Sequence, residues 1–201
     1  MKKLMIMAAF MVAAVTANAQ GAVGSITIQP KIGMNLATIT NCKLGDRDSK
    51  TLVGLVGGAE AEYVLADKVS IAAAALYSKQ GCAFDISGLD YYHYSLDYIN
   101  IPIVANYYIV PGLAIKAGIQ PGFLLGANRK VKWNGGSEES DMKNVLNTFD
   151  LSVPLGASYE YKNFVLDVRY NLDVLKLNKE GESSSHNSVI QFTLGYKLPI
   201  K

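Results

Sequence analysis

Apolar residues alternate with polar or small residues along most of the chain after residue 25. In residues 26–36, for example, Ile26, Ile28, Ile32 and Met34 share one parity, while the other parity is polar or glycine. The alternation recurs in seven further stretches, at residues 53–63, 69–77, 99–109, 113–125, 151–161, 164–174 and 190–198. A period of two is the repeat of a β-strand whose two faces meet different surroundings. The pattern therefore predicts eight β-strands.

The second parity and the connections favour a barrel in a membrane over a soluble sandwich or lipocalin. The second parity is rich in Gly, Ser and Ala, as the crowded interior of a small barrel requires. Short connections near residues 66–68, 110–112 and 162–163 alternate with long ones, at residues 40–51, 80–92, 127–148 and 176–188. Short turns at one end and long loops at the other are typical of transmembrane barrels, and about ten residues per strand suffice to cross a bilayer. We predict an all-β fold, an eight-stranded antiparallel up-and-down transmembrane β-barrel with periplasmic termini and four long extracellular loops.

The first nineteen residues have the pattern of a secretory signal peptide. Lys2 and Lys3 form a positive start, residues 4–15 are uncharged and apolar, and Ala17-Asn18-Ala19 fits a small-x-small cleavage site. The alternative, a buried N-terminal helix of a cytosolic domain, explains this order of features less well. We therefore predict a cleaved signal peptide at residues 1–19, an exported β-barrel domain at residues 20–201 and no helical membrane span elsewhere.

Composition and charge narrow the function further. The chain has 19 Lys and Arg against 17 Asp and Glu, and both excess cations lie in the predicted signal peptide. A neutral mature chain disfavours nucleic-acid binding, which depends on clustered Lys and Arg. The sequence contains no phosphate-binding Gly-Lys loop and no metal-spaced His cluster, so we expect no cofactor, no metal site and no nucleic-acid partner.

Four segments resemble strands of the OmpX/OmpA-like outer-membrane β-barrel family, whose members are often labelled porin family proteins. They are Lys31–Asn35, Leu76–Gly81, Leu96–Ile103 and Val168–Leu172. The resemblance implies a small integral protein in the outer membrane of a Gram-negative-type cell. The chain departs from the family at Ala74 and Asn100, where a Glu is usual, and it ends on Lys201 rather than on an aromatic residue.

Charged residues of the second parity are predicted to form a network inside the barrel. The cations are Lys31, Lys116, Arg169 and Lys197, and the anions are Glu60, Glu62, Asp150, Glu160 and Asp167. Isolated charges in such a place would be very costly, so we expect them to pair or to meet trapped water. The network is interpreted as a plug that fixes strand register, with a proton or ion path as the alternative.

Aromatic residues and cysteines add three further expectations. Tyrosines of the apolar parity are expected to form an interfacial girdle, at Tyr63, Tyr77, Tyr107, Tyr159, Tyr161, Tyr170 and Tyr196. Residues 91–94 are interpreted as part of an aromatic belt, or else as a patch that binds glycans or proteins. Cys42 and Cys82 lie in neighbouring long loops of an exported chain, so the alternatives are a disulfide and two unpaired thiols.

The leading function is a structural or interaction role in the envelope, with a monomer embedded in outer-membrane lipid and lipopolysaccharide. The long loops would contact a surface ligand or protein. Residues 127–148 are expected to be a solvated, mobile loop of mixed charge, with a contact to a cation or to lipopolysaccharide as the alternative. Restricted passage of ions or small solutes is the alternative. A lipid A-modifying enzyme is a third hypothesis, for which His93, Ser95, Asp97 and His186 are available, but no catalytic signature surrounds them. We therefore predict no enzymatic activity.

Overall fold

The computed structural model describes residues 22–40, 43–44, 47–86, 91–177 and 185–200, and this part of the chain is almost entirely β-structure. The strands are β1 (Ile26–Ile39), β2 (Lys43–Leu44), β3 (Arg47–Asp48), β4 (Lys50–Ala66), β5 (Val69–Phe84), β6 (Tyr91–Asn100), β7 (Ile103–Val110), β8 (Leu113–Trp133), β9 (Gly136–Asp141), β10 (Phe149–Tyr161), β11 (Phe164–Asp173), β12 (Asn187–Tyr196) and β13 (Leu198–Pro199). One 3-10 helix, η1 (Lys143–Val145), lies between β9 and β10. Over these described ranges, no helix is long and apolar enough to cross a membrane.

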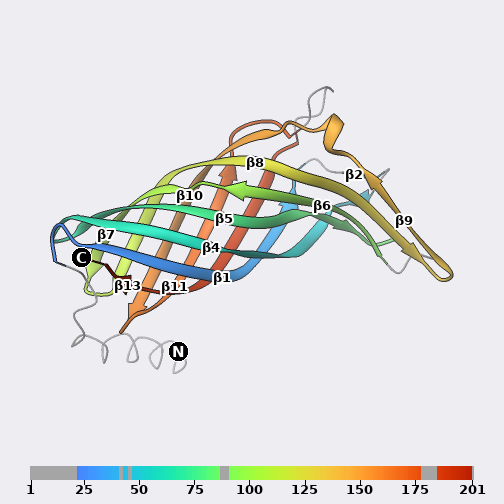
Figure 1. Ribbon diagram of the computed structural model, residues 1–201. Coiled ribbons are helices and arrows are strands. Elements are labelled where there is room, and N and C mark those ends of the chain that lie inside the picture. Colours follow the sequence, from blue (N-terminus) through green and yellow to red (C-terminus); the bar gives the residue numbers. More distant parts are fainter. Residues whose placement is uncertain (1–21, 41–42, 45–46, 87–90, 178–184, 201) are drawn as a thin grey trace, which may run out of the picture.

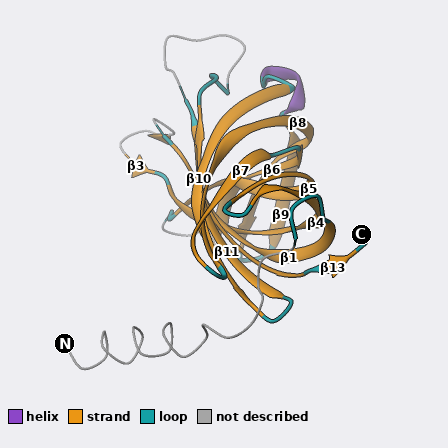
Figure 2. Ribbon diagram, turned by 90° about the vertical axis from the view of Figure 1, so that its left-hand side faces the viewer, coloured by secondary structure: helices purple, strands orange, loops and turns teal. Residues whose placement is uncertain are grey.

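The long strands form a closed ring (Figures 1 and 2). Each pairs antiparallel with its neighbours in the order β10, β11, β12, β1, β4, β5, β6 and β7, β8, and β8 pairs with β10 to close the ring. Strands β6 and β7 both pair with β5 and β8, so they are two halves of one wall strand. The break falls at Ile101 and Pro102, because proline has no N–H to donate to the ladder. In the described part of the chain the wall thus contains eight strands, which confirms the predicted fold class.

The strand register gives the tilt of the barrel. Partners followed from Phe123 on β8 once around the ring lead through Tyr77 and Ile32 to Tyr159, which pairs with Leu113 on β8. The path therefore returns to β8 ten residues away from where it began. Eight strands with this stagger tilt by about 40°. Ten residues of such a strand rise about 25 Å, the height of the apolar band of outer-membrane barrels.

The apolar parity faces outward along this whole band. Ile32 is 69% exposed and Leu55 is 67% exposed, whereas Lys31 and Asn35 of the second parity are buried. A soluble β-protein would bury the apolar face instead, so the orientation predicted from the alternation is confirmed.

Three tight connections define one end of the barrel, named here the short-turn end. They join β4 to β5 at Asp67 and Lys68, β7 to β8 at Pro111 and Gly112, and β10 to β11 at residues 162–163. Gly112 has a φ of 85°, a left-handed conformation that glycine adopts without steric cost. Strand β1 begins and β12 ends at this same end (Figure 1).

The opposite end, named the loop end, differs from the prediction. Residues 127–148 were expected to be a solvated loop, but β8 continues to Trp133 and folds back as β9. This prediction was wrong because charges occupy both faces of the hairpin, so no apolar parity marks the strands. The predicted loop at residues 80–92 is also shorter, since β5 runs to Phe84 and β6 begins at Tyr91. The parts of β5, β6 and β8 beyond the level of Phe123, together with β9, are named the outer extension.

Candidate functional site

Five charged side chains meet in the middle of the lumen and are named the central cluster. Its cations are Lys31, Lys116 and Arg169, and its anions are Glu60 and Asp167, all buried. Each comes from the inward parity of a wall strand: β1, β4, β8 or β11. The cluster lies within the height of the apolar band, where unpaired charges would be strongly destabilising.

Short ion pairs connect all members of the central cluster. Arg169 donates through Nε to Asp167 Oδ1 at 2.8 Å and through Nη2 to Glu60 Oε2 at 2.7 Å. Lys31 Nζ lies 2.7 Å from Glu60 Oε2, and Lys116 Nζ lies 2.6 Å from Asp167 Oδ2. Each carboxylate therefore contacts all three cations, since the remaining Lys31–Asp167 and Lys116–Glu60 distances are 3.4 and 3.6 Å. Such multiple pairing offsets the desolvation of the buried charges.

A second group, named the short-turn cluster, lies nearer the short-turn end. Lys197 Nζ is 2.6 Å from Glu160 Oε2 and 2.8 Å from Glu62 Oε2. Glu62 also accepts hydrogen bonds from the hydroxyls of Ser70 and Tyr108 and from the Asn106 amide. The central cluster has one excess positive charge and the short-turn cluster one excess negative charge, so the two groups balance.

Toward the loop end the inward face becomes uncharged and then apolar. An amide layer follows the central cluster, in which Asn35 donates to Ser78 Oγ at 2.9 Å and Gln120 donates to Ser152 Oγ at 2.9 Å. Beyond it the inward residues form an apolar cap, whose buried members are Ile39, Cys82, Phe84, Tyr92, Leu96, Tyr98, Leu124, Ala127 and Leu177. Sequence reasoning missed this cap, because inward apolar residues in the outer extension interrupt the simple two-residue alternation.

Eight of the nine predicted interior charges lie in the two clusters, and Asp150 lies apart from them. Within the described residues Asp150 forms no ion pair. The register explains this: Gly156 on β10 is the partner of Arg169, and Asp150 lies six residues farther along β10. Six residues of strand span about 20 Å, which places Asp150 near the loop end of the apolar band.

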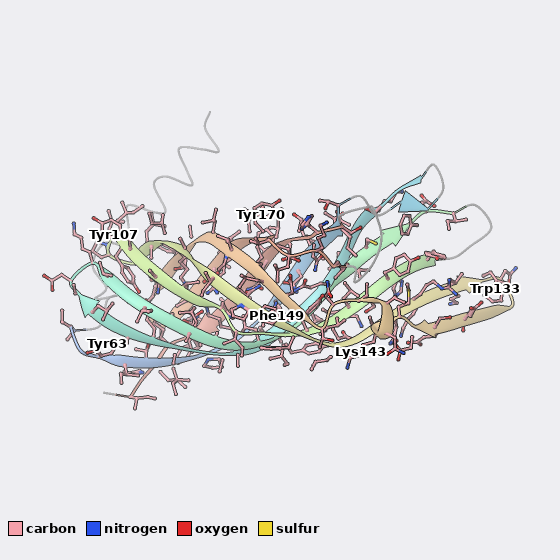
Figure 3. The ribbon with its side chains drawn as sticks, turned by 90° about the horizontal axis from the view of Figure 1, so that it is seen from above. Tyr63, Tyr107, Trp133, Lys143, Phe149 and Tyr170 are labelled. Carbon is pink, nitrogen blue, oxygen red and sulfur yellow. The ribbon has the colours of Figure 1, made fainter. Side chains whose placement is uncertain are left out.

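The seven predicted girdle tyrosines lie at two levels along the barrel. Figure 3 labels Tyr63 and Tyr107 near the short-turn end and Tyr170 farther toward the loop end. Tyr159 and four other tyrosines lie near the short-turn end on the outer wall, and Tyr77 and Tyr170 lie nearer the loop end. The other four are Tyr63, Tyr107, Tyr161 and Tyr196. Two further aromatic residues that the tyrosine pattern missed, Phe123 and Phe149, stack edge to face with ring centroids 5.6 Å apart. The apolar band is therefore bordered by aromatic residues on both sides.

Tyr92 and Tyr94 do not belong to this outer belt. Their rings pack edge to face against Phe84 inside the outer extension, with centroid distances of 5.7 and 6.0 Å. The interpretation of residues 91–94 as an interfacial belt was therefore wrong for these two tyrosines. On β6 they share the parity of the buried Leu96, Tyr98 and Asn100, which faces the interior.

The other candidate residues are distributed over the loop end. Cys82 is buried, whereas Cys42 lies outside the described residues, so their disulfide stays a prediction. Asp97 accepts a hydrogen bond from Tyr77 at 2.7 Å, and His186 Nδ1 lies 3.0 Å from the Leu175 carbonyl oxygen. In the described part of the chain, no three His, Cys, Asp or Glu side chains lie close enough to hold a metal ion.

A closed antiparallel barrel with an apolar outer band, aromatic borders and a polar interior defines a transmembrane β-barrel protein. The family model described as outer membrane protein beta-barrel domain matches residues 18–174. The chain belongs to this family, and it is an outer-membrane protein. The resemblance to OmpX/OmpA-like barrels is confirmed. Short turns are typical of the periplasmic side of such barrels, and the placement of the loop end outside the cell stays a prediction.

The chain is similar to solved outer-membrane proteins at low sequence identity. Ail, the attachment invasion locus protein of Yersinia pestis, in complex with the heparin analogue sucrose octasulfate, is 15% identical, with a TM-score of 0.51 over 88% of this chain and 100% of Ail. Neisserial surface protein A is 15% identical, with a TM-score of 0.49 over 89% of this chain and 100% of that protein. OprG of Pseudomonas aeruginosa is 13% identical, with a TM-score of 0.46 over 90% and 99% of the two chains. No curated protein sequence matches the chain.

Proposed function

We propose that this protein is a non-conducting barrel that acts as a structural and interaction element of the outer membrane. The observation that carries the proposal is the central cluster, which lies across the lumen at the height of the apolar band. An eight-stranded barrel is just wide enough for its own side chains. An ion moving through the lumen would have to separate Arg169 from Glu60 and Asp167, each held within 3 Å.

The outer extension supports an interaction role. Strand β8 continues ten residues past Phe123, about 25 Å of further height at the same tilt. Cross-strand ion pairs join the hairpin, with Arg129 Nη2 3.1 Å from Glu138 Oε1 and Lys130 Nζ 3.2 Å from Glu139 Oε1. The hairpin therefore stands outside the bilayer as an ordered surface that can meet molecules around the cell.

The proposed role is non-catalytic. His93, Ser95 and Asp97 alternate on β6, but the Asp97 carboxylate already accepts a hydrogen bond from the Tyr77 hydroxyl and lies 3.9 Å from Lys79 Nζ. A catalytic carboxylate would be expected to orient the histidine instead. Comparison of lipid A from cells with and without the protein tests this point by mass spectrometry. A difference in lipid A that wild-type protein restores would contradict a non-catalytic role.

Processing and assembly are also part of the proposal. We infer that residues 1–19 are removed on export, that residues 20–201 form the mature barrel, and that the mature protein is a monomer in the bilayer. Residues 1–21 lie outside the described residues, so the support comes from the sequence pattern alone. N-terminal sequencing of protein purified from outer membranes should start at Gln20, and a start at Met1 would contradict the cleavage.

Planar-bilayer recordings test the closed lumen. Wild-type protein should show no stepwise conductance, and a variant with Glu60→Ala and Arg169→Ala should show small openings because it removes one anion and one cation from the central cluster. The matched control is Lys50→Ala with Asp85→Ala, which removes an exposed ion pair outside the lumen and should leave the bilayer silent. Regular openings from wild-type protein would favour restricted passage of ions instead.

A genetic test separates the structural role from the interaction role. Loss of the gene should make the envelope more permeable to a large antibiotic if the barrel supports the membrane. A variant in which residues 128–141 are replaced by a two-residue turn keeps the whole wall within the apolar band. This variant should restore the permeability barrier but not surface interactions. If neither phenotype changes on deletion of the gene, the proposed role is wrong.

A further inference from the structure

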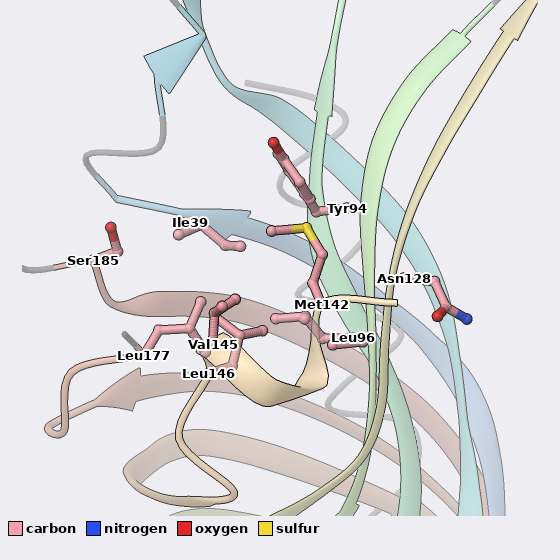
Figure 4. A pocket seen from close by; sticks show the side chains of 10 residues that line it. Ile39, Tyr94, Leu96, Asn128, Met142, Val145, Leu146, Leu177 and Ser185 are labelled. Atoms are coloured by element: carbon pink, nitrogen blue, oxygen red, sulfur yellow. The ribbon is translucent and has the colours of Figure 1, made fainter. Parts of the chain in front are cut away.

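A cavity of about 290 Å³ lies inside the outer extension (Figure 4). Its walls come from the end of β1, from β6 and β8, from the region of η1, and from residues beside β11 and β12. The lining residues are Ile39, Tyr94, Leu96, Ala127, Asn128, Met142, Val145, Leu146, Leu177 and Ser185. Figure 4 shows Ile39, Met142 and Leu146 directed toward the same space, while the Asn128 amide turns away from it. The cavity is therefore chiefly lined by aliphatic side chains.

Backbone hydrogen bonds hold these walls in place. Met142 N donates to Ala127 O at 2.8 Å, and Leu177 N donates to Ser185 O at 2.9 Å. Asn147 N donates to Leu177 O at 2.9 Å, so the segment that follows η1 is joined to the residues beside β11. Segments far apart in the sequence thus form one frame around the cavity. A space framed in this way is a feature of the fold and not a gap between loosely placed loops.

The floor of the cavity separates it from the charged interior. Leu96, Tyr98 and Leu124 are almost completely buried and belong to the apolar cap. Tyr98 on β6 and Leu124 on β8 are register partners. They lie one position nearer the loop end than the Ile99–Phe123 pair. Apolar side chains therefore close the cavity toward the amide layer. A molecule in the cavity would enter and leave from the outside, where Val145 forms an exposed apolar rim.

Size and chemistry limit what the cavity can hold. A dry cavity of about 150 Å³ lined by aliphatic and aromatic residues binds benzene, so 290 Å³ suits about twelve non-hydrogen atoms. Tyr94 and Ser185 contribute hydroxyl-bearing side chains to the lining, and the Tyr94 hydroxyl lies 3.2 Å from that of Tyr92. A hydroxyl both donates and accepts, so either residue can bond one polar group of a ligand. We propose that this cavity binds a small amphipathic molecule, with a hydrocarbon body and a single polar end, that arrives from outside the cell.

The height of the cavity favours a free amphiphile over the tail of a membrane lipid. Leu96 and Ala127 lie beyond the level of Phe123, which borders the apolar band on the outside. Lipid tails end at that level, so they do not reach the cavity from the bilayer. Packed protein interiors contain few voids larger than a water molecule, which makes a retained space of this size a candidate site. The site goes beyond the proposed envelope role and does not depend on whether the lumen conducts.

The two methionines outside the predicted signal peptide provide a reporter and a control. Met142 lines the cavity, whereas Met34 faces lipid on the outer wall. Protein labelled at the methionine methyl carbon with 13C, purified from outer membranes and placed in phosphatidylcholine nanodiscs, is titrated with 1-decanol. The Met142 methyl signal should shift and saturate, whereas the Met34 signal should change only in proportion to the decanol in the bilayer.

Variants show whether the response comes from the cavity. Ala127→Leu fills the space and should abolish the saturable shift of Met142, while Ala157→Leu on the lipid-facing wall should leave it unchanged. Val145→Trp narrows the rim without altering the core, which keeps the test valid if Ala127→Leu does not fold. A Met142 response that never saturates, or that persists in both cavity variants, would overturn the proposal.

A spin-labelled lipid identifies the source of the ligand. Phosphatidylcholine with a nitroxide near the end of its acyl chain should broaden the Met34 signal and leave the Met142 signal sharp. Strong broadening of the Met142 signal before decanol is added would show a lipid tail in the cavity and would overturn the proposal of a free amphiphile as the ligand.

Discussion

Arg169 Nη2 lies 2.7 Å from Glu60 Oε2, although 109 residues separate them and their strands are not neighbours in the ring. Strands β12 and β1 lie between β11 and β4, so the guanidinium reaches across the lumen rather than along the wall. The same group also holds Asp167 on its own strand. Arg169 therefore ties two sides of the barrel together through a space that water would otherwise fill.

Loss of Arg169 should destabilise the barrel strongly. Arg169→Met leaves Glu60 and Asp167 without their shared guanidinium, and breaking a buried pair on one side costs about 3–5 kcal/mol. The free energy of unfolding in urea, measured in lipid vesicles, should fall by this amount. The matched control is Lys50→Met, whose partner Asp85 is 76% exposed at the side chain, and it should change stability by less than about 1 kcal/mol. Equal effects of the two substitutions would contradict a structural role of the central cluster.

A charge on the outer wall should reveal the height of each residue in the bilayer. Ile32 lies near the middle of the apolar band, and Ile109 lies beside the short turn between β7 and β8. Ile32→Arg should therefore destabilise the folded barrel by about 2–4 kcal/mol, and Ile109→Arg by about 0–1 kcal/mol. Unfolding in vesicles measures both values. A larger destabilisation at Ile109 than at Ile32 would contradict the assigned position of the apolar band.

The predicted disulfide can be tested on the purified protein. If Cys42 and Cys82 pair, thiol reagents should label the unfolded, unreduced protein at neither residue and label both after reduction. A disulfide that closes a loop of about 40 residues stabilises by about 4 kcal/mol in the chain-entropy model, so reduction should lower the unfolding midpoint. Cys82→Ser should then be insensitive to reductant. Labelling of unreduced wild-type protein would show two thiols instead.

The order of the hairpin should depend on its cross-strand charges. Glu138→Lys with Glu139→Lys places one lysine directly opposite Lys130 and a second diagonal to Arg129, and like charges directly opposite each other destabilise a strand pair. Hydrogen exchange should become faster in β9, while exchange in β1 and β4 stays unchanged because the hairpin lies outside the ring. The control is Ser137→Thr, which keeps both glutamates and adds no charge opposite Lys132. Faster exchange throughout the barrel would show that the hairpin supports the wall.

The strong two-residue alternation made the transmembrane wall predictable. Residues such as Ile32 and Leu55 face lipid because each strand turns alternate side chains to opposite sides, and this local geometry can be recognised without knowing the partner strands. The inward position of the charges, Lys31 and Glu60 among them, follows from the same rule. The outer extension could not be predicted in this way, because charges on both faces of β8 and β9 remove the periodic signal.

The sequence by itself determined the number of wall strands, their faces, the short turns and the membrane location, since each depends on residues close together in the chain. The tertiary structure alone decided which charges meet, because a stagger of ten residues brings Arg169 to the level of Glu60 and leaves Asp150 apart. It also decided the existence of the apolar cap and its cavity, since their walls come from segments that meet only when the ring closes. Ring closure and register depend on all strands together, whereas the side to which a side chain points is set by the geometry of its own strand.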